Sequence, residues 1–175
     1  MSINLELKAK ITSRSRIFRA LKRMGEPSEI LVQRDTYFRV KSGRLKLREF
    51  GEGKAELIYY KRNEKKGRRW SEYSILCISD SKITKELLKN ALGIDVVVRK
   101  KRHVYYYKGG ARIHFDKVTS LGTFIEFEVQ RRRNKEKAIV LYNELMEIFG
   151  IDDKNVIRCS YSDLIRQRSR LRKTD

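Results

Sequence analysis

Apolar and polar residues alternate with a period of two along many stretches of this chain, a pattern typical of β-strands. The first stretch covers residues 3–11, where Leu5 and Leu7 alternate with Glu6 and Lys8. The same alternation predicts further strands at residues 29–40, 43–50, 54–62, 69–78, 96–107, 111–118 and 123–131. Glycines between several of these runs are typical of hairpin turns.

Other segments repeat their apolar residues at helical spacing, which predicts helices over 13–24, 81–92, 134–149 and 160–172. About eight strands joined mainly by hairpins, with helices inserted between them, indicate the α+β class and an antiparallel sheet large enough to close. A length of 175 residues fits a single domain, residues 1–175. Within it, residues 160–175 are expected to form a C-terminal helix and a basic tail.

The chain is strongly basic, with 42 Lys and Arg against 22 Asp and Glu and a net charge of +20, which favours an anionic partner. The basic residues are spread along the whole chain, so nucleic acid is not expected to be the main partner. No apolar run approaches the roughly 20 residues that cross a bilayer. We therefore expect a soluble, cytoplasmic protein that needs no membrane. Cys77 and Cys159 lie too far apart to suggest a zinc site.

The charged face of each predicted strand allows two interpretations. Such faces usually point to water while the apolar faces form the core. However, amphipathic helices need an apolar surface, and a closed barrel can offer its outer face while polar residues point inward. Asp116, Glu126 and Glu128 lie close together beside strands rich in Arg and Lys. Carboxylates bind hard divalent cations and basic side chains bind phosphate, so a shared cavity would suit a metal–polyphosphate complex.

Eight segments, in order along nearly the whole chain, resemble the CYTH family of triphosphate tunnel metalloenzymes. They are NLELKAKI at 4–11, DTYF at 35–38, GRLKLRE at 43–49, ELIYYKR at 56–62, VRKKRHVYY at 98–106, RIHFDKV at 112–118, LGTFIEFEV at 121–129 and SYSDLI at 160–165. This family includes class IV adenylyl cyclases, thiamine triphosphatases and tripolyphosphatases. The resemblance implies a closed eight-stranded antiparallel β-barrel, or tunnel, with a polar interior and helices packed outside. The helix around Tyr161 would close one tunnel mouth.

The resemblance also implies a set of site residues and a cofactor, Mg²⁺ or Mn²⁺. The expected metal ligands are Glu6, Asp116, Glu126 and Glu128. The expected triphosphate-binding residues are Lys8, Arg44, Lys46, Arg48, Lys61, Lys100, Arg102 and Arg112. Asn4 stands where the family usually has a first glutamate, so one metal site would lose a charged ligand. His114 shares a strand face with Arg112 and Asp116, but a single histidine in a strand is more often structural, and no general base is assigned.

We expect the chain to hydrolyse inorganic tripolyphosphate or a nucleoside triphosphate, because hydrolysis needs only a seated triphosphate and an attacking water. An alternative is a class IV adenylyl cyclase that converts ATP to cyclic AMP and pyrophosphate, which also requires the nucleoside to be held in a particular pose. A second alternative is a non-enzymatic binder of RNA or polyphosphate, whose affinity should fall steeply with salt and be indifferent to chelation. The sequence leaves the oligomeric state open, a homodimer included.

Overall fold

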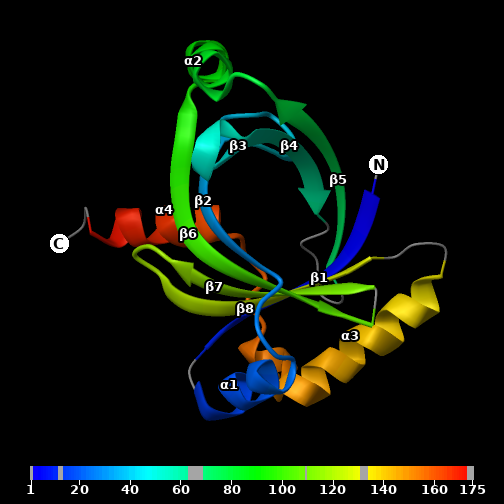
Figure 1. Cartoon of the computed structure of the whole chain (residues 1–175). Coiled ribbons are helices and arrows are strands. Elements are labelled where there is room, and N and C mark those ends of the chain that lie inside the picture. The colour runs from blue at the N-terminus through cyan, green and yellow to red at the C-terminus, as the bar shows by residue number, and fades with distance from the viewer. Residues whose placement is uncertain (1, 12–13, 63–68, 109, 131–133, 173–175) are drawn as a thin grey trace.

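In the computed structural model, which describes residues 2–11, 14–62, 69–108, 110–130 and 134–172, the strands close into a barrel (Figure 1). The strands are β1 (Ser2–Lys10), β2 (Glu29–Phe38), β3 (Arg44–Phe50), β4 (Ala55–Arg62), β5 (Arg69–Ile78), β6 (Ile94–Tyr107), β7 (Ala111–Val118) and β8 (Gly122–Gln130). Their order around the barrel is β1-β5-β4-β3-β2-β6-β7-β8. All neighbouring strands pair antiparallel. The predicted closed eight-stranded barrel is therefore confirmed.

The barrel closes because β1 pairs along both of its edges. Residues 2–6 of β1 pair with β5, and residues 4–10 pair with β8. Because both of its edges are bonded, β1 leaves no seam in the sheet. The predicted strand at 29–40 ends earlier, at Phe38, where the register between β2 and β6 shifts.

The helices lie outside the barrel and cover different parts of its wall (Figure 1). They are α1 (Arg14–Arg23), α2 (Ser81–Leu92), α3 (Lys135–Phe149) and α4 (Tyr161–Leu171), with short 3₁₀ turns at Gly51–Gly53 and Asp153–Asn155. Helices α1 and α3 lie together beneath β7 and β8, whereas α2 lies at the opposite side of the molecule. Among the described residues, no helix has the length and apolar character needed to span a bilayer.

The main apolar core lies between the barrel wall and the helices α1 and α3. Leu5 and Leu7 of β1 are buried there with Phe127 of β8. The ring of Phe127 lies 5.0 Å from that of Phe149 in α3. Each such side chain contributes about 1.5–3 kcal/mol of burial free energy. Since this core is outside the wall, the opposite faces of the same strands are left for polar residues inside the barrel.

Two further features hold α2 in place. Under α2, Phe38 and Leu47 form a smaller core with Leu88 of the helix. Asp80 caps α2 by accepting a hydrogen bond from the backbone N–H of Ile83.

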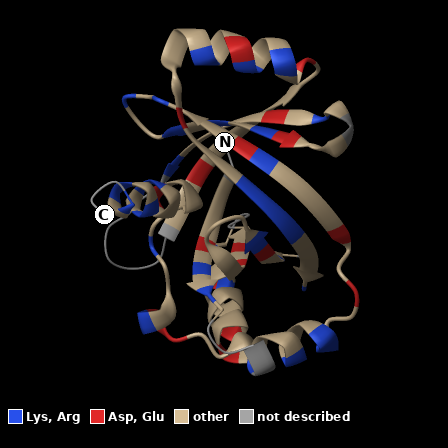
Figure 2. Cartoon of the chain, turned by 90° about the vertical axis from the view of Figure 1, so that its left-hand side faces the viewer, with Lys and Arg blue, Asp and Glu red and all other residues tan. Residues whose placement is uncertain are grey.

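Lys and Arg are distributed over both strands and helices, with acidic residues interspersed (Figure 2).

Candidate functional site

Charged side chains fill the inside of the barrel, which is an unusual place for them. Glu6 and Lys8 alternate with Leu5 and Leu7 on β1, so they point to the opposite face, and Lys8 is only 1% exposed. Buried with them are Asp35, Lys46, Lys100, Arg102, His114, Asp116 and Glu126. Removing an ion from water costs several kcal/mol, so these groups must compensate one another or serve a ligand.

One wall of the interior carries the carboxylates and is built by the adjacent strands β1, β8 and β7. In the strand register, Glu6 lies opposite Glu128, and Lys8 lies opposite Glu126. On the other side of β8, Arg112 is opposite Glu128 and His114 is opposite Glu126. Nη2 of Arg112 donates to Glu128 at 2.7 Å, and Nζ of Lys8 lies 3.2 Å from Oε1 of Glu126.

The facing wall, from β2, β3 and β6, gathers cations around one buried carboxylate, Asp35. Lys46 Nζ donates to it at 2.8 Å, Arg48 Nε at 2.8 Å and Lys100 Nζ at 3.2 Å. Burial would raise the pKa of Asp35, but the charges of Arg48, Lys100 and Lys46 outweigh it and hold that pKa well below its usual range. Three cations around one anion leave this wall with an excess of positive charge.

The ammonium of Lys46 is the least stable charge of this group. Burial, reinforced by repulsion from Arg48, lowers the pKa of Lys46 to about 7 against the attraction of Asp35. An anionic ligand beside Lys46 would favour its protonated form, since an added negative charge raises the pKa of an amine.

Arg102 links the two walls. Its Nε donates to Oδ1 of Asp116 at 2.7 Å and its Nη2 donates to Oδ2 at 2.5 Å, a two-pronged contact, and Nη2 also contacts Glu126. Burial disfavours the charged guanidinium, but the carboxylates of Asp116 and Glu126 outweigh burial and raise the pKa of Arg102 well above its usual value. Arg102 therefore stays charged although it is buried inside the barrel.

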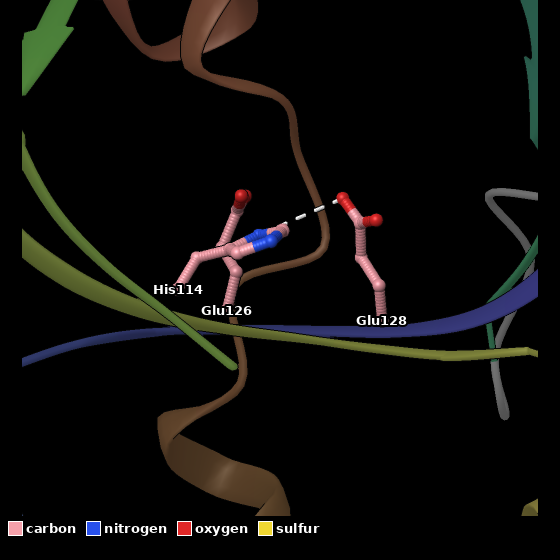
Figure 3. A group of neighbouring side chains, drawn as sticks. All are labelled: His114, Glu126 and Glu128. Carbon is pink, nitrogen blue, oxygen red and sulfur yellow. Dashed lines mark ion pairs between the residues drawn. The ribbon is translucent and has the colours of Figure 1, made fainter. Parts of the chain in front are cut away.

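His114, Glu126 and Glu128 form a group in which one donor atom from each lies within 4.8 Å of the others (Figure 3). Nδ1 of His114 is 3.7 Å from Oε1 of Glu128. Burial and the charge of Arg102 lower the pKa of His114 to about 4, so its imidazole is neutral near pH 7. Burial raises the pKa of Glu128, but His114, which is protonated only below about pH 4, and the permanently charged Arg112 outweigh burial and hold the pKa of Glu128 at about 2.

This group passes a simple test for a divalent metal ion. Its donors are carboxylate oxygens and a neutral imidazole, which both coordinate such ions. Moreover, the buried atoms His114 Nδ1 and Asn4 Oδ1 make no hydrogen bond to the described residues. Buried polar atoms are normally satisfied, so these two are available as metal ligands.

A cavity of about 210 Å³ lies between the two walls. Its lining includes Asn4, Glu6, Lys46, Arg48, Arg102, Arg112, His114 and Glu128. At its outer rim are the exposed residues Glu29, Ile75 and Tyr106. A charged ligand can therefore reach the basic and acidic walls together from this end.

The opposite end of the barrel is covered by the start of α4. Tyr161 is 5% exposed, donates its hydroxyl to Asp116 at 2.9 Å and lies under Lys8, whose Nζ is 3.8 Å from the ring centroid. Ser160 and Asp163 form a capping box that begins the helix at this point. Asp163 also accepts from Nη2 of Arg44 at 2.9 Å, which ties β3 to the helix.

The structure places most of the predicted site residues inside the barrel, in two layers. Those that line the cavity are Glu6, Lys46, Arg48, Arg102, Arg112 and Glu128. Those buried nearer to α4 and Tyr161 are Lys8, Lys100, Asp116 and Glu126. Arg44 is held at the α4 end by Asp163.

Lys61 does not line the cavity between the two walls but a second pocket beside Arg44 and Asp163. Its neighbour Tyr60 is buried and lines the cavity together with Ile58 and Glu56. Strand alternation therefore turns Lys61 outward, where it is exposed and lies opposite Glu72 of β5. Because Tyr59 and Tyr60 are adjacent and both partly apolar, the sequence does not show which of them points into the barrel.

Sequence reasoning missed two members of the site. Asp35 was part of a recognised segment, but its role as the anchor of three cations depends on partners from β3 and β6 that only the fold brings together. His114 was interpreted as structural. Its position two residues before Asp116 on the charged face of β7 was the available signal.

The fold and the site together define an antiparallel barrel with a charged tunnel. The family model of the CYTH domain matches residues 2–161, so the chain belongs to the CYTH family. Members of this family act on triphosphates, as triphosphatases or adenylyl cyclases, and generally depend on divalent metal ions. A search of curated proteins finds no significant match.

Solved structures from several organisms share this fold. The PH1012 protein of Pyrococcus horikoshii OT3 aligns with a TM-score of 0.81 at 22% identity, over 92% of this chain and 98% of that one. A candidate adenylyl cyclase of Hippeastrum with a dominant triphosphatase activity gives 0.66 at 17% identity, over 97% and 96%. The Mimivirus capping enzyme triphosphatase gives 0.58 at 16% identity, over 87% and 90%. At these identities, the likeness shows the fold alone.

Proposed function

We propose that this protein hydrolyses a triphosphate, inorganic tripolyphosphate or a nucleoside triphosphate, inside the barrel with the help of Mg²⁺ or Mn²⁺. The observation that carries the proposal is the meeting of two walls in one cavity. Lys46, Arg48 and Arg102 face it from the basic side, and Glu6 and Glu128 face it from the acidic side. A basic wall alone would suit any polyanion, whereas the opposed carboxylates suit an anion that arrives with metal ions.

The basic side chains are already held in position before a ligand binds. Asp35 fixes Lys46, Arg48 and Lys100 at distances of 2.8–3.2 Å. Cations fixed in this way need little reorganisation to stabilise charge that develops on phosphate oxygens. The excess positive charge of this wall is then neutralised by the triphosphate.

The carboxylates Glu6, Glu126 and Glu128, with Asp116 behind them, would hold the divalent ion. Such an ion would supply Lewis-acid stabilisation of phosphoryl oxygens and would activate an attacking water. Arg102 contacts Asp116 and Glu126 in the structure. When ligand binds, it can exchange part of this contact for a phosphate oxygen while Asp116 keeps its orientation.

The direct test is to incubate the pure protein with tripolyphosphate and, separately, with ATP, in the presence of Mg²⁺ or Mn²⁺. We expect release of phosphate that stops on addition of EDTA. Glu128→Gln should lower the rate by at least about 100-fold, because it removes a charge from the metal-binding wall. Glu136→Gln, an exposed carboxylate in the first turn of α3, is the matched control and should leave the rate unchanged.

The same incubation decides between the alternatives. Cyclic AMP and pyrophosphate as the main products from ATP would replace hydrolysis by the adenylyl cyclase activity. That alternative is favoured by Phe50, Ile75 and Tyr106 beside the cavity, which offer apolar surface to a nucleoside. Binding without turnover, steeply weakened by salt and unaffected by EDTA, would identify a polyanion binder instead.

A further inference from the structure

We propose that His114 is a direct metal ligand together with Glu126 and Glu128, and that its nitrogen shifts metal preference from Mg²⁺ toward Mn²⁺ and Co²⁺. The proposal rests on the metal dependence proposed above and adds to it a ligand and a selectivity. The chain thus would bind its metal through a mixed nitrogen and oxygen donor set.

The strand register brings these donors together. Glu126 and Glu128 are two residues apart on β8, so they share the inner face, and His114 of β7 lies directly opposite Glu126. The side chains point toward the same space from the two neighbouring strands (Figure 3). Because all three come from paired strands and not from loops, their relative positions are fixed by the sheet.

One nitrogen of the imidazole, Nδ1, lacks among the described residues the hydrogen bond that a purely structural histidine would make with it. His114 is 3% exposed, and its Nδ1 makes no hydrogen bond to the described part of the chain. At 3.7 Å, the contact of this atom with Glu128 is longer than a hydrogen bond. A buried nitrogen left without a partner beside two carboxylates is explained by coordination to a metal ion.

The spacing fits an ion after a small movement. Two ligands on opposite sides of an ion with bonds of about 2.1 Å are about 4.2 Å apart. The donor atoms here lie within 4.8 Å of one another. Lys8 and Arg102 form ion pairs with Glu126 and partly neutralise its charge, and Arg112 partly neutralises the charge of Glu128. A neutral nitrogen donor adds a ligand without adding repulsion between carboxylates.

The identity of the donor determines the selectivity. Mg²⁺ is hard and prefers oxygen ligands in a near-ideal octahedron, whereas the divalent ions of the first transition row accept an imidazole nitrogen more readily. Replacing His114 by asparagine keeps a polar side chain but exchanges the imidazole for an amide. The affinity for Mn²⁺ and Co²⁺ should therefore fall while the affinity for Mg²⁺ changes little.

The experiment measures metal binding on untagged protein stripped with EDTA. Pulsed electron paramagnetic resonance of bound Mn²⁺ should show coupling to an imidazole ¹⁴N in the wild type and none in His114→Asn. Calorimetric titration should show a loss of about 10-fold or more in Mn²⁺ affinity in the variant, with Mg²⁺ affinity kept within about 3-fold. His103→Asn is the matched control, since His103 is the second of the two histidines in the chain and packs edge-on against Phe115.

Absence of imidazole coupling in the Mn²⁺-bound wild type would overturn the proposal. So would equal losses of Mn²⁺ and Mg²⁺ affinity in a folded His114→Asn protein, because they would show a general disturbance. If the variant fails to fold, the wild-type spectrum together with that of His103→Asn decides the question. Phosphate release without imidazole coupling refutes this inference alone, whereas coupling without turnover of tripolyphosphate or ATP refutes the proposed hydrolysis alone.

Discussion

Replacing Asp35 by asparagine tests whether the basic wall is held together by a single carboxylate. The side chain keeps its shape but loses its charge, while Lys46, Arg48 and Lys100 remain within about 3 Å of the same place. Their mutual repulsion is then uncompensated in a buried site, since Asp35 is 1% exposed. We expect the variant to fold into the same barrel with a lower free energy of unfolding.

The magnitude follows from the number and burial of the contacts. Removing one partner of a buried ion pair costs about 3–5 kcal/mol. Three cations share Asp35, so a larger loss would be expected if all remained charged. Lys46 limits the loss, because its pKa is already about 7 and the amine can release its proton. We therefore expect about 3–5 kcal/mol, which for a chain of this size is a fall in Tm of roughly 6–20 °C.

Urea denaturation followed by circular dichroism measures this free energy, provided that the slope of the transition is the same in both proteins. Asp152→Asn is the control, because the Asp152 side chain is 68% exposed and its contact with Lys154 is 3.8 Å long. It should change stability by no more than about 0.5 kcal/mol. Addition of tripolyphosphate should stabilise Asp35→Asn more than the wild type, since the ligand replaces the missing negative charge.

Unfolding of Asp35→Asn at the same urea concentration as the wild type, with an unchanged slope, would contradict the role of Asp35 as the anchor of the basic wall. That result would mean that water or rearranged side chains satisfy the three cations at no cost. Asp35 would then not be needed to hold the basic side chains in place, and other contacts would organise the basic wall.

Further predictions follow from single contacts of the same structure. The pKa of Lys46 is lowered to about 7, so its amine is mostly neutral at pH 8. A bound triphosphate raises that pKa, so binding at pH 8 should take up a proton, which calorimetry detects as binding heats that differ between buffers. Below pH 7 the difference should fade, because Lys46 is already protonated there. Tyr161→Phe removes the hydroxyl that donates to Asp116 and should cost about 1–3 kcal/mol in urea denaturation, and no change would contradict this contact. Asp163→Ala removes half of the capping box of α4 and should lower the free energy of unfolding by about 1–2 kcal/mol. Lys61→Ala should leave phosphate release within about twofold of wild type, because Lys61 is exposed and does not line the cavity between the two walls, and a larger fall would show that Lys61 takes part in the site.

The order and type of the elements could be predicted from the sequence because alternation is a local property. Along β7, the polar residues Arg112, His114 and Asp116 alternate with Ile113 and Phe115, and the predicted bounds 111–118 are those observed. Which face points inward is a different question, since a period of two describes both faces equally. It was decided by the helices, because α1 and α3 need the apolar face and so leave the charged face inside.

Pairings between distant strands could not be predicted in the same way. Lys100 reaches Asp35 across 65 residues of sequence, and no local pattern records that contact. The orientation of Lys61 was difficult to predict for the opposite reason, because either Tyr59 or Tyr60 could occupy the apolar position of β4 and the sequence does not decide between them. Asn4 was recognised as an unusual residue from the resemblance, and the structure adds that its amide lies 3.5 Å from Glu128.

The double pairing of β1 has a consequence for how the protein is made. β1 leaves the ribosome well before its partner β8, and Asn4 meets Glu128 across a separation of 124 residues. The barrel cannot close until β8 (Gly122–Gln130) has been synthesised, and until then the edge of β1 that pairs with β8 is unprotected, although its other edge can already pair with β5. A delay at this step would expose nascent chains to aggregation. We therefore expect slow closure of the barrel, rather than low stability of the folded protein, to limit the yield of soluble protein.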